Sequence, residues 1–112
     1  MNRVVITGRG IYSCLGSNAE EVTASLRAGK SGIIFDPIRK EMGFRSALVG
    51  NVQVPDLKTE LGRKERKTMP EEALYAFVAT KQALEHAGIT QEFIDQNEVG
   101  ILFGNDSTAG AV

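Results

Sequence analysis

The side chains best suited to covalent or metal chemistry occur singly in this sequence. Cys14 is the only cysteine and His86 the only histidine. A nucleophilic thiolate needs a base or a helix dipole that favours its charged form, and neither is evident beside Cys14. A tetrahedral zinc site needs several such ligands. We therefore predict no catalytic residue, no metal site and no internal disulfide here, and a cytoplasmic protein; His86 is predicted to be solvated or to cap a helix end.

Two glycine-containing segments match nucleotide-binding patterns in part. Residues 24–31 end in Gly29-Lys30-Ser31, but a phosphate-binding loop leaves a strand and opens a helix, whereas this one closes a predicted helix. Gly8 and Gly10 follow a predicted strand, yet Ser13 stands where a dinucleotide fingerprint has its third glycine. A turn in which glycine permits close backbone approach explains this pair better. We expect no cofactor, and a small nucleotide-binding α/β protein is the least favoured interpretation.

One stretch of the chain is strongly basic although the whole is not. The 13 Lys and Arg against 14 Asp and Glu give a net charge of −1, which does not favour nucleic acid or anionic lipid as partners. No apolar run is long enough to span a bilayer or to form a signal-peptide core. The basic residues lie within positions 58–67 and include Arg63, Lys64, Arg66 and Lys67. Such a cluster is either a solvated surface or a docking site for an acidic partner.

The remaining pattern predicts alternating strands and helices. We expect a strand at 4–8, a helix at 18–28, an irregular segment with a short extended piece at 32–42, a strand or bulged hairpin at 46–54, a helix at 73–87, a short capped turn at 90–95 and a strand at 99–104. Capping boxes at 17–20, or one residue on at 18–21, and at 68–71 mark the two main helix starts. This order indicates an α/β domain with at least partly parallel strands.

The apolar surface of these elements exceeds what 112 residues can cover. In the helix at 73–87, small residues recur at spacings of three and four, which lets another backbone approach closely; they are Ala73, Ala76, Thr80, Ala83 and Ala87. Two apolar strands and this helix need cover on both faces. The chain is therefore expected to form a tight oligomer or to open a larger domain.

Taken in order, several short segments resemble the N-terminus of β-ketoacyl-acyl-carrier-protein synthases, above all the stand-alone elongating enzymes of types I and II. The segments are residues 4–10 with Gly16, residues 26–33, Arg63-Lys64 with Lys67 and Met69, Ala83 with Ala87-Gly88, and residues 99–104. The resemblance implies a thiolase-like layered αβαβα fold, of which residues 1–112 would be the N-terminal part of the first half, with no complete second domain. Arg9 and the pair Ser13-Cys14 depart from the usual family residues.

The resemblance also implies a reaction and partners. An acyl chain would pass from acyl carrier protein to a cysteine, and malonyl carrier protein would lose carbon dioxide and condense with it. That chemistry uses one cysteine and two histidines, which in the family lie downstream of Val112, so this chain alone is expected to be inactive. Acyl and malonyl thioesters are the expected substrates, and the complete enzyme is expected to be a cytoplasmic homodimer.

Two family roles map onto residues present here. The loop 104–110 resembles the turn that lines the acyl pocket, with Ser107 and Thr108 in place of the usual glycines. A shorter or more polar pocket is the resulting expectation. The family's carrier-protein docking patch matches Lys64 and Lys67 best, with Arg63 and Arg66 in support.

Three interpretations follow for the whole chain. It is a fragment of a fatty-acid condensing enzyme, a non-catalytic interaction or dimerisation subunit of the same fold, or the nucleotide-binding protein already described. The chain stops among the small residues 109–112, inside an expected pocket loop, which favours the fragment.

Overall fold

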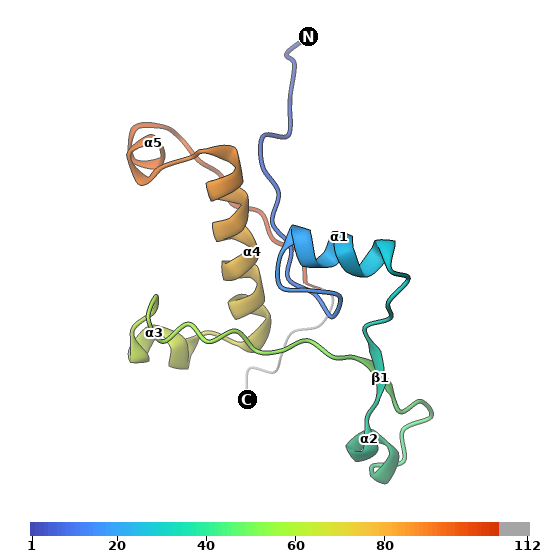
Figure 1. Cartoon of the computed structure of the whole chain (residues 1–112). Coiled ribbons are helices and arrows are strands. Elements are labelled where there is room, and N and C mark those ends of the chain that lie inside the picture. The colour runs from blue at the N-terminus through green and yellow to red at the C-terminus, as the bar shows by residue number, and fades with distance from the viewer. Residues whose placement is uncertain (106–112) are drawn as a thin grey trace. The chain divides into compact units, whose positions relative to one another are not determined.

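The computed structural model describes residues 1–105, which form two compact units. The α1 unit is Ile11–Gln53, and the α4 unit joins Met1–Gly10 to the chain from Val54 onward. The elements, labelled in Figure 1, are α1 (Ala19–Arg27), β1 (Ile33–Phe35), α2 (Pro37–Glu41), β2 (Leu48–Gly50), α3 (Arg63–Thr68), α4 (Glu71–Ala87) and α5 (Gln91–Gln96).

Helix α1 confirms the predicted helix at 18–28, with its cap in the second of the two registers. The Asn18 side chain accepts a hydrogen bond from the Glu21 backbone N–H at 2.9 Å. The Glu21 carboxylate in turn accepts from both the backbone N–H and the hydroxyl of Ser17, at 2.7 and 2.8 Å. These hydrogen bonds lower the pKa of Glu21. The helix is followed by Gly29, whose φ of 63° suits glycine.

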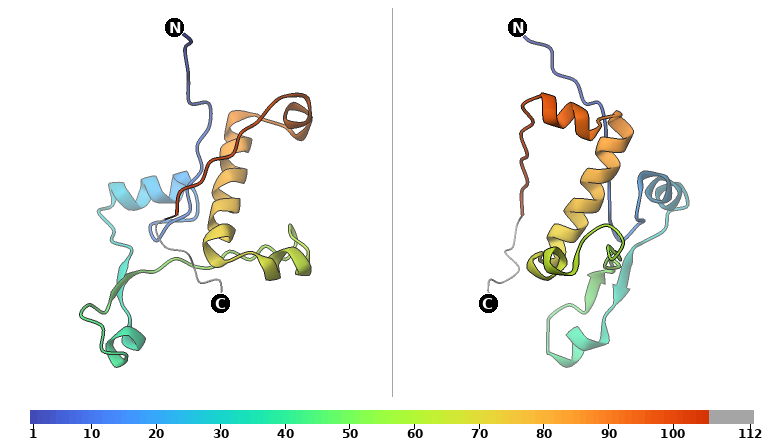
Figure 2. Two further views of the ribbon diagram at one scale, coloured as in Figure 1. Left: turned by 180° about the vertical axis from the view of Figure 1, so that it is seen from behind. Right: turned by 90° about the vertical axis from the view of Figure 1, so that its left-hand side faces the viewer.

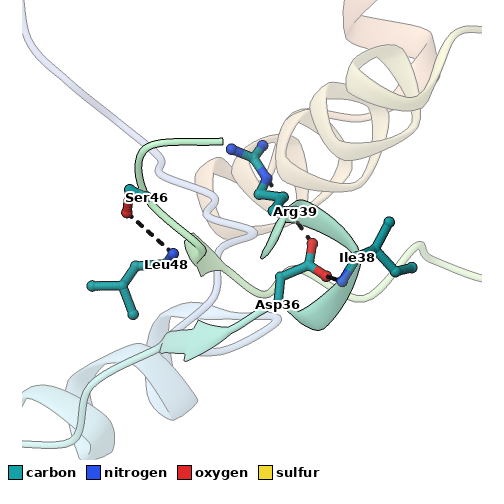
Figure 3. A network of polar contacts seen from close by, with 5 residues as sticks. All are labelled: Asp36, Ile38, Arg39, Ser46 and Leu48. Atoms are coloured by element: carbon teal, nitrogen blue, oxygen red, sulfur yellow. Dashed lines mark hydrogen bonds and ion pairs between the residues drawn. The ribbon is translucent and has the colours of Figure 1, made fainter. Parts of the chain in front are cut away.

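The segment between α1 and the end of the unit is more regular than predicted. Strands β1 and β2 pair antiparallel, with Ile34 opposite Val49. This confirms the short extended piece at 32–42 and, of the two alternatives at 46–54, the strand and not the bulged hairpin. The expected parallel pairing does not occur within residues 1–105. Between β1 and β2 lies α2, which was not predicted. Asp36 caps it by accepting from the Ile38 N–H at 2.9 Å, and Pro37 occupies the first turn, where its missing N–H costs nothing. Figure 3 shows this cap.

Helix α4 confirms the predicted helix at 73–87, but its start does not use the predicted capping box. Pro70 stands at the N-cap and no side chain bonds there. The Thr68 hydroxyl instead donates to the Glu65 carbonyl at 2.8 Å, because Thr68 still belongs to α3. Gly88 ends α4 with a φ of 68°, as predicted. The Thr90 side chain caps α5 through the Phe93 N–H, also as predicted.

The N-terminal segment runs beside α4 in close backbone contact (Figures 1 and 2). A Cβ placed on Gly8 would lie 2.2 Å from the Ala83 carbonyl oxygen, and one on Gly10 would lie 1.8 Å from that of Ala79. Real Cβ atoms do not come so near to backbone oxygens. The predicted close approach to the small-residue face of this helix is therefore confirmed, and it requires glycine at both positions.

The strands predicted at 4–8 and 99–104 are wrong for this structure. Both segments are extended, but neither is paired with another strand within residues 1–105. The Ile6 and Leu102 side chains are 94% and 98% exposed. A strand needs a neighbour to satisfy its backbone groups, and the described chain supplies none here. The only hydrophobic residues buried in the described part are Val22 and Leu57.

Candidate functional site

The four basic residues of the predicted docking patch lie together on α3 and form what we call the basic surface: Arg63, Lys64, Arg66 and Lys67. At 3.6 residues per turn, these positions fall within an arc of about 160° around the helix axis. Glu65 lies outside that arc. Arg63, Lys64 and Lys67 are exposed and Arg66 is half-buried. The structure thus brings the predicted residues together on one side of a helix.

The charged side chains of α3 differ in whether they form hydrogen bonds or ion pairs within residues 1–105. The Glu65 carboxylate accepts a hydrogen bond from the Gly62 backbone N–H at 2.7 Å and so caps the helix start. Arg66 donates from Nε to the Leu61 carbonyl at 3.1 Å, which steadies its guanidinium. Within residues 1–105, Arg63, Lys64 and Lys67 make no ion pair. The basic surface therefore presents positive charge that no carboxylate of the described chain neutralises.

The segment leading into α3 is anchored at two points. Leu57 is 4% exposed, and its carbonyl accepts from the backbone N–H of Glu60 and of Leu61 in a tight turn. The Lys81 ammonium, on α4, then pairs with the Glu60 carboxylate at 2.7 Å. That hydrogen bond raises the pKa of Lys81. Sequence reasoning missed this pair, because 21 residues separate its members and neither stands out in any pattern.

A second feature of the α4 unit is an apolar groove of about 480 Å³ along α4. It lies between α4 and the extended segment 101–105. Its lining residues are Glu72, Ala73, Ala76, Phe77, Thr80, Ile101, Phe103, Gly104 and Asn105. The predicted pocket residues Ser107 and Thr108 follow directly but lie outside the described residues. The groove is an unfilled apolar space bordered by the chain that leads into that loop.

The family model for the β-ketoacyl synthase N-terminal domain matches residues 1–111. The chain belongs to the β-ketoacyl synthase family. It is 42% identical over 106 residues to 3-oxoacyl-[acyl-carrier-protein] synthase 1 of Escherichia coli strain K12, covering 94% of this chain and 26% of the relative. It is 40% identical over 104 residues to the synthase 1 of Haemophilus influenzae, covering 93% and 25%. The chain thus spans about a quarter of the length of these relatives.

A crystal structure of a β-ketoacyl synthase from Burkholderia phymatum STM815 superimposes on this chain with a TM-score of 0.68 at 30% identity. The match covers 82% of this chain and 23% of the other. The resemblance and the thiolase-like α/β fold inferred from the sequence are thereby confirmed.

In this β-ketoacyl synthase chain, Cys14 and His86 have structural surroundings rather than catalytic ones. The Cys14 side chain packs against Gly32 and Gly50, where a Cβ on Gly32 would lie 2.7 Å from its sulfur. It lines a hollow of the α1 unit together with Lys30. His86 Nδ1 accepts a hydrogen bond from the Arg9 backbone N–H at 3.1 Å. His86 is exposed, as predicted, and through this hydrogen bond it also holds the backbone of the N-terminal segment on α4.

Residues 1–105 contain neither a cluster of metal ligands nor a helix that could span a membrane. No group of three or more His, Cys, Asp or Glu side chains is placed to share a metal ion in that part of the chain. None of the helices described is both long enough and apolar enough to cross a membrane. The basic surface and the apolar groove are thus the features from which a function can be argued.

Proposed function

We propose that this chain is the N-terminal part of a condensing enzyme that elongates acyl chains with malonyl-acyl carrier protein. The proposal is supported by the family match, by the names of the relatives, which are 3-oxoacyl-[acyl-carrier-protein] synthases, and by their length, about four times that of this chain. It is also supported by apolar surface that residues 1–105 leave uncovered, from Val4 to Phe103. Such surface is expected where further layers of a larger enzyme pack.

The reaction proposed for the complete enzyme is a decarboxylative Claisen condensation. The acyl group moves from the carrier-protein thiol to a cysteine of the enzyme. Malonyl carrier protein loses carbon dioxide, and the resulting carbanion attacks the acyl-enzyme thioester and expels the cysteine thiolate. Cys14 and His86 have no part in this scheme, since they pack on glycines and on backbone. Residues 1–112 alone are therefore proposed to be inactive, within a cytoplasmic homodimeric enzyme.

The part of this function assigned to the described residues is docking of acyl carrier protein. The single observation that carries the assignment is the basic surface, whose exposed charges are not paired within residues 1–105. Acyl carrier protein is acidic, and complementary charge speeds encounter and orients the complex. Because α3 holds all four side chains within one arc, a single acidic helix or loop of the partner could meet them together.

The test is charge reversal in the complete enzyme. Lys64→Glu with Lys67→Glu is expected to raise the Michaelis constant for acyl carrier protein about tenfold at low salt and to leave kcat unchanged. Arg27→Glu with Lys40→Glu makes the same change in net charge on the α1 unit and serves as the matched control. A Michaelis constant that both pairs leave unaltered would refute the docking assignment. A parent protein that binds carrier protein without turnover would instead identify the non-catalytic subunit.

The pocket loop is the second assignment, and it concerns acyl-chain length. Ser107 and Thr108 add polar side chains where the family usually has glycine, so we propose a shorter or more polar acyl pocket. The apolar groove supports this placement, since Gly104 and Asn105 border it and lead into the loop. Ser107→Gly in the complete enzyme is expected to shift the product profile towards longer chains. An unchanged profile would remove the proposal.

A further inference from the structure

Two glutamates next to the basic surface, Glu60 and Glu65, each accept a hydrogen bond from another group of the chain. Of the four basic residues, only Arg66 is held in this way. Glu65 accepts from the Gly62 backbone N–H and lies outside the basic arc. Glu60 is bound by the Lys81 ammonium, and the two side chains are 34% and 50% exposed. Neither carboxylate is paired with a member of the basic surface itself. The surface therefore keeps its full charge although two glutamates lie within the same short stretch.

Glu60 is close enough to disturb an acidic partner. It lies three residues before Arg63, so their Cα atoms are at most about 11 Å apart. That separation is comparable to the Debye length of about 10 Å at 0.1 M salt. An unneutralised carboxylate there would repel an acidic protein approaching Arg63 and Lys64. The Lys81 ammonium, 2.7 Å away, cancels this charge at its source.

We propose that Lys81 is a positioning residue for partner docking: it holds and neutralises the Glu60 carboxylate, so that an acidic carrier protein meets no unneutralised Glu60 charge beside the basic surface. The inference rests on the proposed docking function. Lys81 acts through Glu60 and does not itself touch the reacting atoms. The ion pair joins α4 to the turn before α3, so the long helix of the unit sets the charge of the surface beside it.

The experiment compares four variants of the complete enzyme by steady-state kinetics with acyl carrier protein at low salt. Lys81→Gln frees the Glu60 carboxylate and is expected to raise the Michaelis constant about two- to fivefold with kcat unchanged, in the range of an exposed ion pair. Glu60→Gln combined with Lys81→Gln removes the carboxylate as well and is expected to restore the parental value. Lys81→Arg keeps the pair and is expected to behave as the parent.

Lys58→Gln is the matched control, because it removes the same charge from another exposed pair, Lys58 with Asp56 at 3.8 Å. It is expected to change the Michaelis constant less than Lys81→Gln does. If the double variant binds as weakly as Lys81→Gln, the pair acts only as a tether and the neutralising role is wrong. An unchanged Lys81→Gln, beside an impaired Lys64→Glu and Lys67→Glu enzyme, overturns this inference and leaves the docking function standing. If the enzyme with Lys64→Glu and Lys67→Glu is also unimpaired, both this inference and the docking function are wrong.

Discussion

Helices α3 and α4 follow one another with only Met69 and Pro70 between them, yet they meet their surroundings in opposite ways. Helix α3 has six residues, four of them Lys or Arg, and all but Arg66 are exposed. Helix α4 has 17 residues, lies against a glycine-containing backbone segment and borders an apolar groove. The surface of α3 is charged and solvated, whereas α4 borders apolar area that residues 1–105 leave uncovered. The exposed charges of α3 can therefore be tested directly as a docking surface, whereas the apolar side of α4 is understood only together with what packs on it.

The largest expected effect tests the backbone contact on α4. Gly10→Ala places a methyl group where only 1.8 Å separates it from the Ala79 carbonyl oxygen. Since that oxygen belongs to the helix backbone, it has little room to move, and we expect a loss of about 3 kcal/mol in the free energy of unfolding of the complete enzyme. Thermal or urea unfolding measures it.

The matched control is Gly62→Ala at the start of α3. A Cβ there would meet only the Glu65 carboxylate, at 3.2 Å. That group is the end of a flexible side chain, so a change below about 0.5 kcal/mol is expected. Equal losses of unfolding free energy in Gly10→Ala and Gly62→Ala would show that the backbone contact on α4 is no tighter than the side-chain contact at the start of α3.

A smaller effect is expected at the anchor of α3. Leu57→Ala removes most of a side chain that is 4% exposed and should cost about 2–3 kcal/mol in the free energy of unfolding. Val54→Ala, three residues earlier and 57% exposed, should cost less than about 1 kcal/mol. Denaturant midpoints of the two variants check this. A small loss at Leu57 would mean that α3 is not held by burial at its base.

The smallest effect is the pH dependence of the pair between Lys81 and Glu60. The pKa of Lys81 is raised above its usual value of 10.5 by its hydrogen bond to Glu60. The stabilisation from this pair is therefore fully present below the unfolded-state pKa and is lost as pH rises through the folded-state value. The stability difference between the parent and Lys81→Gln should be constant from pH 8 to 10 and vanish above that folded-state pKa. A difference that persists unchanged into that range would contradict the ion-pair explanation.

Local signals in the sequence predicted α1, α4 and the capped turn that forms α5, but neither α2 nor α3. Asn18 with Glu21, Gly88 and Thr90 each did what their residue types favour at helix ends. Helix α2 was missed although Asp36 and Pro37 carry a start signal, because five residues are too few to show a period. The box at 68–71 failed because α3 already used Thr68, so two helices competed for one residue.

Signals that depend on distant partners were less reliable. Short continuous apolar runs predicted buried strands at 4–8 and 99–104, but a strand forms only beside a neighbour, and the described chain offers none there. The basic surface was predicted because its members are close in sequence. The ion pair between Lys81 and Glu60 was not predicted, because its members are 21 residues apart and no local sequence pattern links them.

The hydrogen bond from Arg9 to His86 joins positions 77 residues apart. During synthesis at about 5–20 residues per second, the first ten residues leave the ribosome about 4–15 seconds before the helix they rest on. Throughout that interval Gly8, Arg9 and Gly10 lack the helix backbone and the His86 side chain that they contact in the folded chain. This segment must therefore wait for a contact surface that is made several seconds later.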